Sequence, residues 1–312
     1  MKVTIDLIRR IARRPMTGKQ MANAESVITA LDRYGSRVGL DLPHRLAQYL
    51  PQVMHESGEF RYDREVWGPT PAQERYDTRT DLGNTPERDG DGKKNSGRGP
   101  LQVTGGFNIG EFQDWCVENI GGNVPNFREN PDLINTDPWE GLSAIWYWST
   151  RGLNRYADAG DIEMITKRIN GGLNGYADRL ALYVRTALVM LGYEPDAIRT
   201  FQIDAKAKGL YTRAIDGDAG PGTRAALHKS LAALSKSRVD AAPVTQKEPS
   251  GSSVAIAAGG AAPAAAVAAP SIEDVVRSVT DQQHELASGD IARIVIAAVI
   301  VGLTVWLAMR RR

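Results

Sequence analysis

The sequence predicts a mainly α-helical protein, and three observations lead to that expectation. Apolar residues recur at helical spacing over 43–56, where Leu46, Leu50 and Val53 fall on one face. The same pattern returns in four later segments: 109–117, 138–150, 161–168 and 176–191. Between 58 and 110, by contrast, glycines, prolines and aspartates are frequent, which indicates a long loop that could include a short hairpin.

The helix expected over 43–56 has recognisable ends. Asp41 is expected to cap its start, and Pro43 suits its first turn. Pro51 is expected to kink or split the helix, because proline has no N–H to donate. Glu56 stands at the far end and is followed by Gly58, so its carboxyl group is expected at a junction between helix and loop.

Composition divides the chain into four parts. Residues 1–193 have globular composition and form the expected large domain, and residues 196–235 form a second, small one. Residues 236–290 are rich in Ala, Pro, Ser and Gly, which cannot bury enough surface to offset chain entropy, so we expect a disordered, flexible linker. Residues 291–309 are almost wholly apolar.

The apolar run near the end of the sequence is long enough to cross a membrane. Its 19 residues, 291–309, would reach about 28 Å as a helix, close to the ~30 Å of a bilayer's hydrocarbon core. Three arginines, 310–312, follow it and favour a cytoplasmic end. We therefore expect a C-terminal transmembrane helix, with a buried helix of a soluble core as the alternative.

Charge and cysteine content exclude several classes of function. The 38 basic and 37 acidic residues nearly cancel, so the chain has no overall field that would bind nucleic acid. One cysteine, Cys116, cannot form an intramolecular disulfide, and with 4 histidines a zinc site of the Cys/His type is not expected. We predict no cofactor and no metal. Arginines interrupt the apolar residues of the first 15 positions, so no signal peptide is expected.

Carboxylates remain as the candidate catalytic groups. Cleavage of a glycosidic bond needs one protonated carboxylic acid for the leaving oxygen and a second carboxylate for the water or the sugar cation. Glu56 is the candidate acid because of its place at the helix end. The acids that follow it and could serve as its partner are Asp63, Glu65, Glu74 and Asp77.

Three ordered motifs carry a resemblance to a known family. They are His-Glu-Ser-Gly at 55–58, Gly-Arg-Gly-Pro-Leu-Gln-Val-Thr at 97–104 and Ile-Asn-Gly-Gly at 169–172. Together they resemble the family 19 glycoside hydrolases, the group of chitinases and endolysins, and segment 67–85 is similar to the bacterial and phage endolysin branch. The resemblance covers residues 20–190 and implies a lysozyme-like, two-lobed helical catalytic domain with the substrate between the lobes.

The resemblance also implies an inverting mechanism with assigned residues. Glu56 matches the general acid, which a relatively apolar setting would keep protonated. Glu65 is the best match to the base, and Glu74 is the fallback. Inversion needs the two carboxyl groups about 6.5 to 9.5 Å apart, to admit a water. Thr104 matches the hydroxyl that holds this water, with the cap of the next helix as its alternative role.

Other matched residues are expected to bind substrate. Gln102, Asn108 and Asn170 match positions that hydrogen-bond sugars, although Asn170 could instead cap a turn. Arg98 and Arg179 are expected either to contact sugar or to brace a catalytic carboxylate.

Trp67 lies in the candidate loop and is expected to face sugar, while the other tryptophans suit core packing or the membrane segment. Two positions depart from the family pattern: Glu59 stands where glycine is common, and Ile109 stands where an aromatic residue is usual. Glu59 adds an acid near the site and so complicates the choice of base.

The small domain resembles the helical peptidoglycan-binding domains of cell-wall hydrolases. The resemblance rests on Asp-Gly-Asp-Ala-Gly-Pro-Gly-Thr-Arg-Ala-Ala-Leu at 216–227. A helical extension of the large domain is the alternative.

These inferences combine into one expected function. The chain is expected to be a peptidoglycan hydrolase, similar to an endolysin or muramidase, that cuts β-1,4 bonds between amino sugars. Its tail would anchor it in the inner membrane of a Gram-negative-type cell, where it acts on the periplasmic wall. A holin pore, insertion led by the tail and regulated release would each explain access to the wall without a signal peptide. The alternatives are a chitinase and a catalytically inactive anchor that links peptidoglycan to the membrane.

Overall fold

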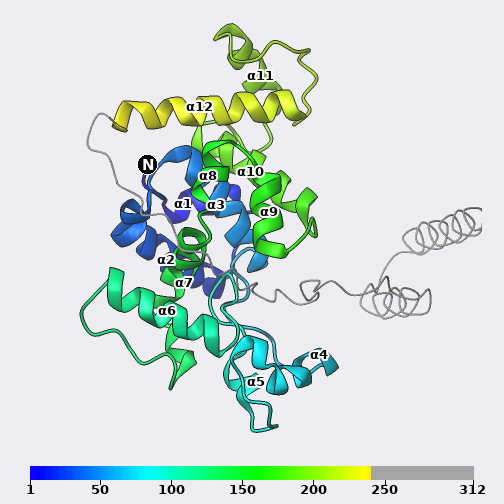
Figure 1. Cartoon of the computed structure of the whole chain (residues 1–312). Helices are drawn as coiled ribbons and strands as arrows, with labels where there is room; N and C mark the ends of the chain where they lie inside the picture. The colour runs from blue at the N-terminus through cyan, green and yellow to red at the C-terminus, as the bar shows by residue number, and fades with distance from the viewer. Residues whose placement is uncertain (240–312) are drawn as a thin grey trace, which may run out of the picture. The chain divides into compact units, whose positions relative to one another are not determined.

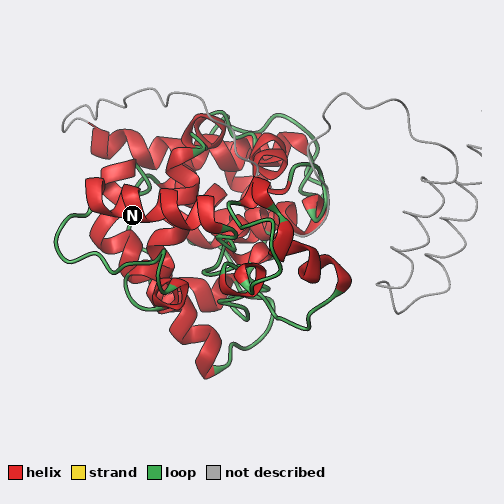
Figure 2. Cartoon of the chain, turned by 60° about the horizontal axis from the view of Figure 1, so that its bottom comes forward, coloured by secondary structure: helices red, strands yellow, loops and turns green. Residues whose placement is uncertain are grey.

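The computed structural model describes residues 1–239, which fall within one compact unit. Within this range the regular structure is helical, so the prediction of a mainly α-helical protein is confirmed (Figures 1 and 2). The α-helices are α1 (Ile5–Ile11), α2 (Gly18–Tyr34), α3 (Pro43–Glu56), α4 (Pro71–Glu74), α5 (Asp91–Lys94), α6 (Gly106–Asn119), α7 (Trp139–Thr150), α8 (Asn154–Asp158), α9 (Ile162–Asn170), α10 (Tyr176–Met190), α11 (Ile198–Ala207) and α12 (Pro221–Val239). Short 3-10 turns are η1 (Gly35–Val38), η2 (Arg75–Thr78), η3 (Thr80–Leu82) and η4 (Pro131–Asn135).

Helix α3 is the centre of the described unit. Every side chain from Pro43 to Met54 is buried except that of Arg45, so this helix is covered on all sides. A helix of this kind lies in a core rather than on a surface. It packs against α10 along its length and also against α8 and α12, while α7 packs against α2. Helix α3 is therefore held by several neighbours.

The predicted bounds of α3 agree with the structure, but its start differs in detail. The residue that caps it is Leu42, not Asp41, and no side chain caps this end. Leu42 has φ −81° and ψ 129°, an extended conformation that a residue before proline prefers, so Pro43 sets the first turn. Pro51 lies inside α3 without splitting it.

The segment between α3 and α6 contains short elements instead of one irregular loop. Helix α4 is followed by turns η2 and η3 and then by helix α5, and these elements lie together at the lower end of the view in Figure 1. The expected hairpin reduces to two isolated antiparallel bridges, Arg64 with Arg98 and Arg98 with Val103. These bridges join the residues around Glu65 to the motif at 97–104.

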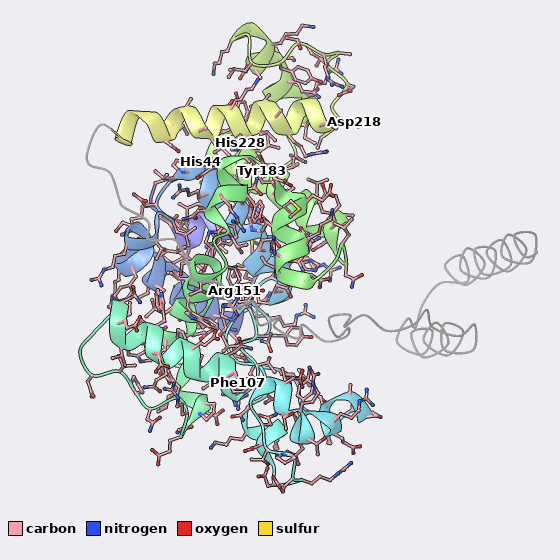
Figure 3. The ribbon with its side chains drawn as sticks, viewed as in Figure 1. His44, Phe107, Arg151, Tyr183, Asp218 and His228 are labelled. Carbon is pink, nitrogen blue, oxygen red and sulfur yellow. The ribbon has the colours of Figure 1, made fainter. Side chains whose placement is uncertain are left out.

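Helices α11 and α12 follow the large domain without a break in packing. Helix α12 lies against α3 and α10. The Nδ1 atom of His44 is 2.8 Å from Oγ of Ser235, and Nε2 of His228 is 3.1 Å from the carbonyl oxygen of Asp158. Figure 3 labels both histidines where α12, which carries His228, meets α3, which carries His44. Residues 196–235 therefore belong to the same unit as the large domain, and their role in wall binding stays a prediction.

The loop that leads into α12 is organised by Gln202, whose side chain is fully buried on α11. Its amide nitrogen is 2.7 Å from Oδ1 of Asp216 and 3.0 Å from Oγ1 of Thr223. Its amide oxygen accepts the N–H of Gly217 at 2.8 Å. One buried side chain thus fixes the Asp-Gly-Asp turn whose last residue, Asp218, is labelled in Figure 3.

Two predictions fall at or beyond the described range. Helix α12 runs to Val239, so the linker predicted from residue 236 begins no earlier than 240. The rest of that linker and the helix predicted over 291–309 lie outside the described residues. Among residues 1–239, no helix has the length and apolar character needed to cross a membrane.

Candidate active site

Glu56 is the last residue of α3, and a buried arginine holds its carboxyl group. Arg179 of α10 has no exposed side-chain surface, and its Nη2 atom donates a hydrogen bond to Oε1 of Glu56. Its Nη1 atom donates to Oε1 of Gln52, one turn earlier on α3. The Glu56 side chain is 16% exposed, so its carboxyl is only partly open to solvent. The setting expected to be apolar is in fact an ion pair.

Tyr147 of α7 connects Glu56 to the Ile-Asn-Gly-Gly motif. Its buried hydroxyl lies 3.4 Å from the carbonyl oxygen of Ile169, to which it donates. Burial raises the pKa of Tyr147 to about 12; the nearby carboxylate of Glu56 adds to this rise, and the Arg151 guanidinium opposes it. Arg151 also stacks on the Tyr147 ring, with its CZ atom 4.6 Å from the ring centroid. No sequence motif pointed to Tyr147, which sits in an ordinary apolar helix pattern.

Glu65 is held by the second motif. Its Oε2 atom accepts the backbone N–H of Gly97 at 3.0 Å, and its own backbone N–H donates to the Gly97 carbonyl at 2.9 Å. Its Oε1 atom accepts from Nε2 of Gln73 at 2.9 Å. Gln73 also forms a capping box with Thr70 at the start of α4. That box is a recognisable sequence signal, which could have identified Gln73.

Two aromatic residues lie beside Glu65. Burial raises the pKa of Tyr76, and the Glu65 carboxylate raises it further, so the two groups are close. The ring of Trp67 is tilted against the ring of Tyr76, with 6.2 Å between the centroids. Trp67 is half-buried, and its contact with sugar stays a prediction. Glu74, the fallback base, is exposed on α4, and within the described residues its side chain has no ion pair or hydrogen bond.

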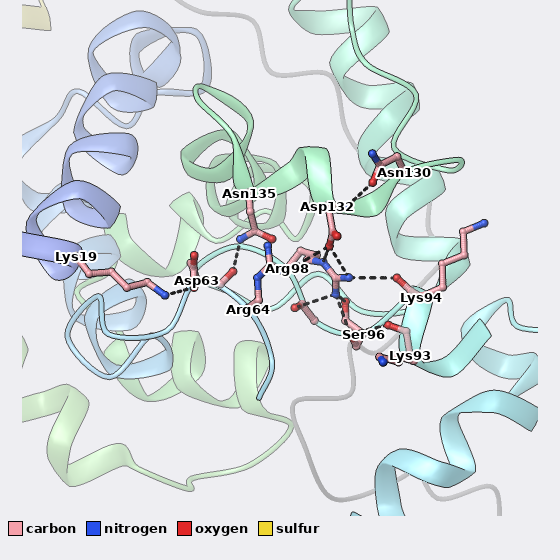
Figure 4. Close-up of polar contacts among 11 residues, drawn as sticks. Lys19, Asp63, Arg64, Lys93, Lys94, Ser96, Arg98, Asn130, Asp132 and Asn135 are labelled. Carbon is pink, nitrogen blue, oxygen red and sulfur yellow. Dashed lines mark hydrogen bonds and ion pairs between the residues drawn. The ribbon is translucent and has the colours of Figure 1, made fainter. Parts of the chain in front are cut away.

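Arg98 does not brace either candidate glutamate in the described structure. Its side chain is buried, and its Nη2 atom lies 2.8 Å from Oδ1 of Asp132. Its Nε atom also donates to Oδ1 of Asp132, Nη1 donates to the Ser96 carbonyl, and Nη2 donates to the Lys94 carbonyl as well (Figure 4). The Arg98 guanidinium thus joins the chain at residues 94–98 to Asp132 of turn η4.

Gln102 and Thr104 of the second motif bond within their own segment, whereas Asn108, which follows the motif, also bonds to Arg151. The Nε2 atom of Gln102 donates to the Gly99 carbonyl at 2.8 Å, and Oγ1 of Thr104 donates to the Gln102 carbonyl at 2.8 Å. The amide of Asn108 donates to the Thr104 carbonyl at 2.8 Å and accepts from Arg151 at 3.3 Å. Thr104 and Asn108 are both buried, so their expected contacts with water and sugar stay predictions.

Asn170 follows the residue that Tyr147 contacts. Its Oδ1 atom is buried and has no hydrogen-bond partner among the described residues. The next residue, Gly171, has φ +77° and ends α9 in the left-handed conformation. Glycine adopts this conformation without steric cost, so Gly171 is explained by the end of the helix.

Known proteins resemble this chain in part. No family model matches it. A glycosyl hydrolase family 19 domain-containing protein of Haemophilus influenzae is 38% identical over 102 residues, which are 33% of this chain and 46% of that protein. An endochitinase of Arabidopsis thaliana is 25% identical over 182 residues, 57% of this chain and 64% of that protein. The chain thus spans about half the length of the curated relatives it matches.

Two solved chitinase structures are also similar to this chain, each over 62% of its length. A bacterial family 19 chitinase is 22% identical, with a TM-score of 0.45 over 62% of this chain and 97% of that chain. Chitinase C from Streptomyces griseus HUT6037 is 20% identical, with a TM-score of 0.43 over 62% of this chain and 78% of that chain. The first of the sequence relatives is named for a glycosyl hydrolase family 19 domain, and the second is named as an endochitinase.

Proposed function

We propose that this protein is a family 19 glycoside hydrolase that cleaves β-1,4 bonds between the amino sugars of peptidoglycan. The observation that carries the proposal is the pairing of Glu56 with the buried Arg179 at the end of α3. A carboxyl group fixed by a buried neighbour keeps one orientation, which proton transfer to a bound substrate requires. The pair lies among residues that match the family's motifs, and the sequence relatives support the same chemistry.

The proposed mechanism inverts the sugar carbon. Glu56 would protonate the oxygen of the bond that breaks, while Glu65 would take a proton from the water that attacks the opposite face of the ring. Only Oε1 of Glu56 contacts Arg179, and Oε2 has no hydrogen bond within the described residues, so Oε2 is the oxygen to carry the proton. The donors from Gly97 and Gln73 support Glu65 as the base, because they hold its carboxylate in place.

The first prediction concerns the two carboxyl groups. Glu56→Gln and Glu65→Gln should each reduce the release of reducing ends from purified sacculi by about 100-fold or more, since each removes one proton-transfer group. Glu74→Gln is the matched control and should leave the rate within twofold of the parent. Thermal unfolding should show that all three variants are folded. Full activity of Glu56→Gln would contradict the proposal.

Chitin is the second candidate substrate, because several relatives are named as endochitinases. Chitin oligomers and sacculi offered to the same preparation separate the two. Mass spectrometry of the products identifies which sugar forms the new reducing end. Cleavage of chitin oligomers alone would replace peptidoglycan by chitin in the proposal and leave the roles of the glutamates unchanged.

We also propose, on sequence grounds, that residues 196–235 bind the wall and that residues 291–309 anchor the chain in the inner membrane of a Gram-negative-type cell. Comparison of the full chain with a chain that ends at residue 239 tests the anchor: only the full chain should sediment with membranes. Binding to sacculi without any released reducing ends would favour the inactive anchor instead.

A further inference from the structure

Three consecutive residues after Glu56 adopt a left-handed backbone conformation. Gly58 has φ +59°, Glu59 has φ +57° and Phe60 has φ +65°. Glycine occupies this region freely, whereas a residue with a Cβ atom is strained there. Two such residues in sequence persist only where the surrounding structure holds them. This turn connects Glu56 to the chain that carries Glu65.

Side chains of α2 hold the backbone of the turn. The amide of Gln20 donates to the Glu59 carbonyl at 2.9 Å, and the amide of Asn23 donates to the Phe60 carbonyl at 2.9 Å. The Phe60 N–H donates to Oγ of Ser57 at 2.8 Å, and the Phe60 ring is buried. These contacts account for the path of Phe60 but leave the side chain of Glu59 to be explained.

Arg13 binds the Glu59 side chain. The Arg13 backbone N–H donates to Oε2 of Glu59 at 3.0 Å, and its Nε atom donates to Oε1 at 2.6 Å. The segment before Arg13 is itself fixed on α10, because Nε of Arg185 donates to the Ile11 carbonyl at 2.9 Å. The carboxylate of Glu59 is thus an anchor, which explains why a side chain is present at a position where glycine would adopt the backbone conformation without strain.

The same guanidinium reaches the helix that carries Arg179. Nη1 of Arg13 pairs with Oδ1 of Asp178, and Oδ2 of Asp178 is 2.6 Å from Nδ1 of His55. Burial acts to raise the pKa of Asp178, but the hydrogen bonds from Arg13 and His55 outweigh it and lower the pKa. His55 and Asp178 each directly precede one member of the Glu56–Arg179 ion pair.

There is little space for His55 to move away from this contact. A Cβ atom on Gly175 would lie 2.2 Å from Nε2 of His55, so the imidazole fills the space in front of the first turn of α10. Arg13 therefore joins three features around Glu56: the left-handed turn that follows it, the histidine that precedes it, and the acid next to its ion-pair partner.

We propose that Arg13 is a positioning residue for Glu56. It holds the turn after Glu56 through Glu59, and it holds the residue before Glu56, His55, through Asp178. One side chain therefore fixes the backbone on both sides of Glu56. The inference rests on the proposed function, in which the orientation of Glu56 limits the rate of proton transfer. Arg13 does not itself contact the substrate.

The test compares Arg13→Met with Arg14→Met in the full chain. Arg14 is the next residue, is exposed, and has no ion pair among the described residues, so it controls for the loss of charge. With soluble peptidoglycan fragments, Arg13→Met should reduce kcat about tenfold or more and change KM less than twofold. Arg14→Met should change neither. Arg13→Lys should recover part of kcat, since lysine can still pair with Asp178.

A spectroscopic readout makes the inference independent of activity. Nitrogen-15 NMR of the histidine rings, with His55 assigned from a His55→Gln variant, should show a shift of the His55 signals in Arg13→Met. The signals of His44 and His228, which lie where α3 meets α12, should stay where they are. Unmoved His55 signals, or an equal kcat in Arg13→Met and Arg14→Met, would overturn the positioning role. A parent protein that releases no reducing ends, with His55 signals that do shift, would instead count against the proposed function alone.

Discussion

Glu140 is a buried acid that the candidate mechanism does not use. It lies in the first turn of α7 and is 6% exposed. Burial raises its pKa to about 8, and the carboxylates of Asp63 and Asp137 add to the rise. Asp63 is in turn held by Lys19, with 3.1 Å between Nζ and Oδ1 (Figure 4). Glu140 is therefore neutral in the folded protein at pH values at which it is ionised in the unfolded chain.

The pH dependence of stability should reveal this group. Because the folded state binds its proton more tightly, the stabilisation is complete below the ordinary pKa of 4.5 and is lost as the pH rises to about 8. Glu140→Gln should remove this loss and, at pH 9, increase the free energy of unfolding by roughly 5 kcal/mol relative to the parent. Glu25→Gln, on the exposed face of α2, is the control. Denaturant unfolding at pH 5, 7 and 9 measures the difference, and parallel pH curves for parent and variant would contradict it.

Sequence patterns identified individual site residues unevenly. Glu56 and Glu65 were candidates because short motifs surround them, and each has defined hydrogen-bond donors in the structure. Tyr147 and Arg13 could not be found in this way, since their roles depend on contacts between segments far apart in the chain. The expected apolar setting of Glu56 was wrong, because the guanidinium of Arg179 pairs with its carboxyl group; a contact between Arg179 and a carboxylate was one of the two roles expected for this arginine.

Among the connecting elements, the turn at Gly99 packs tightly against α7. Gly99 has φ +73°, and an added Cβ atom would lie 2.2 Å from Oγ of Ser143. Ser143 is fully buried, and its hydroxyl donates to the Glu140 carbonyl at 2.7 Å. The loop carrying the second motif thus rests directly on α7. Neither partner can move aside without breaking a buried hydrogen bond.

Substitution of this glycine should therefore cost more than backbone strain alone. Gly99→Ala should destabilise the protein by about 2–4 kcal/mol, as the sum of left-handed strain and a steric clash. Gly152→Ala is the matched control: it has φ +60° and open space around its Cβ position, so it should cost only about 1 kcal/mol. Thermal unfolding of the two variants gives the difference. Equal losses would show that the contact with Ser143 is not tight.

At the level of helices, periodicity predicted the segments of α3, α6, α7, α9 and α10, but it missed α2 (Gly18–Tyr34), whose buried face includes small and polar residues such as Ala24 and Ser26. The bounds predicted for the helix 43–56 are those of α3, and α7, α9 and α10 occupy the predicted segments closely. Elements of four residues, such as α4 and α5, have no periodic face and were read as loop. Their formation depends on capping and on tertiary contacts, which a hydrophobic pattern does not report.

At the scale of the whole molecule, the packing of α12 decides how many folding units the described chain contains. Helix α12 shares contacts with α3 and α10, and the His44–Ser235 hydrogen bond ties its far end to the first turn of α3. Arg45, next to His44, forms two hydrogen bonds with Asp158, at 2.6 and 2.8 Å. Helix α3, at the centre of the large domain, thus also packs against α12 of the small domain.

A chain that ends at residue 239 should consequently unfold in a single cooperative transition. Calorimetry should give one peak whose calorimetric and van't Hoff enthalpies agree. Ser235→Ala should lower its midpoint by a few degrees without splitting it, because one buried hydrogen bond contributes about 1 kcal/mol. Two resolved peaks, one of them assignable to residues 196–239, would show that the small domain folds by itself.

The contact between α12 and α3 also has a mechanical consequence. Val239 is where α12 leaves the described part of the chain, so tension arriving from later residues would load α12 first. Since α12 rests on α3, the force would act along the helix that bears Glu56 rather than on a peripheral loop. Stretching a single molecule from that end should accordingly perturb α3, which bears Glu56, before the opposite, α4-bearing end of the protein yields.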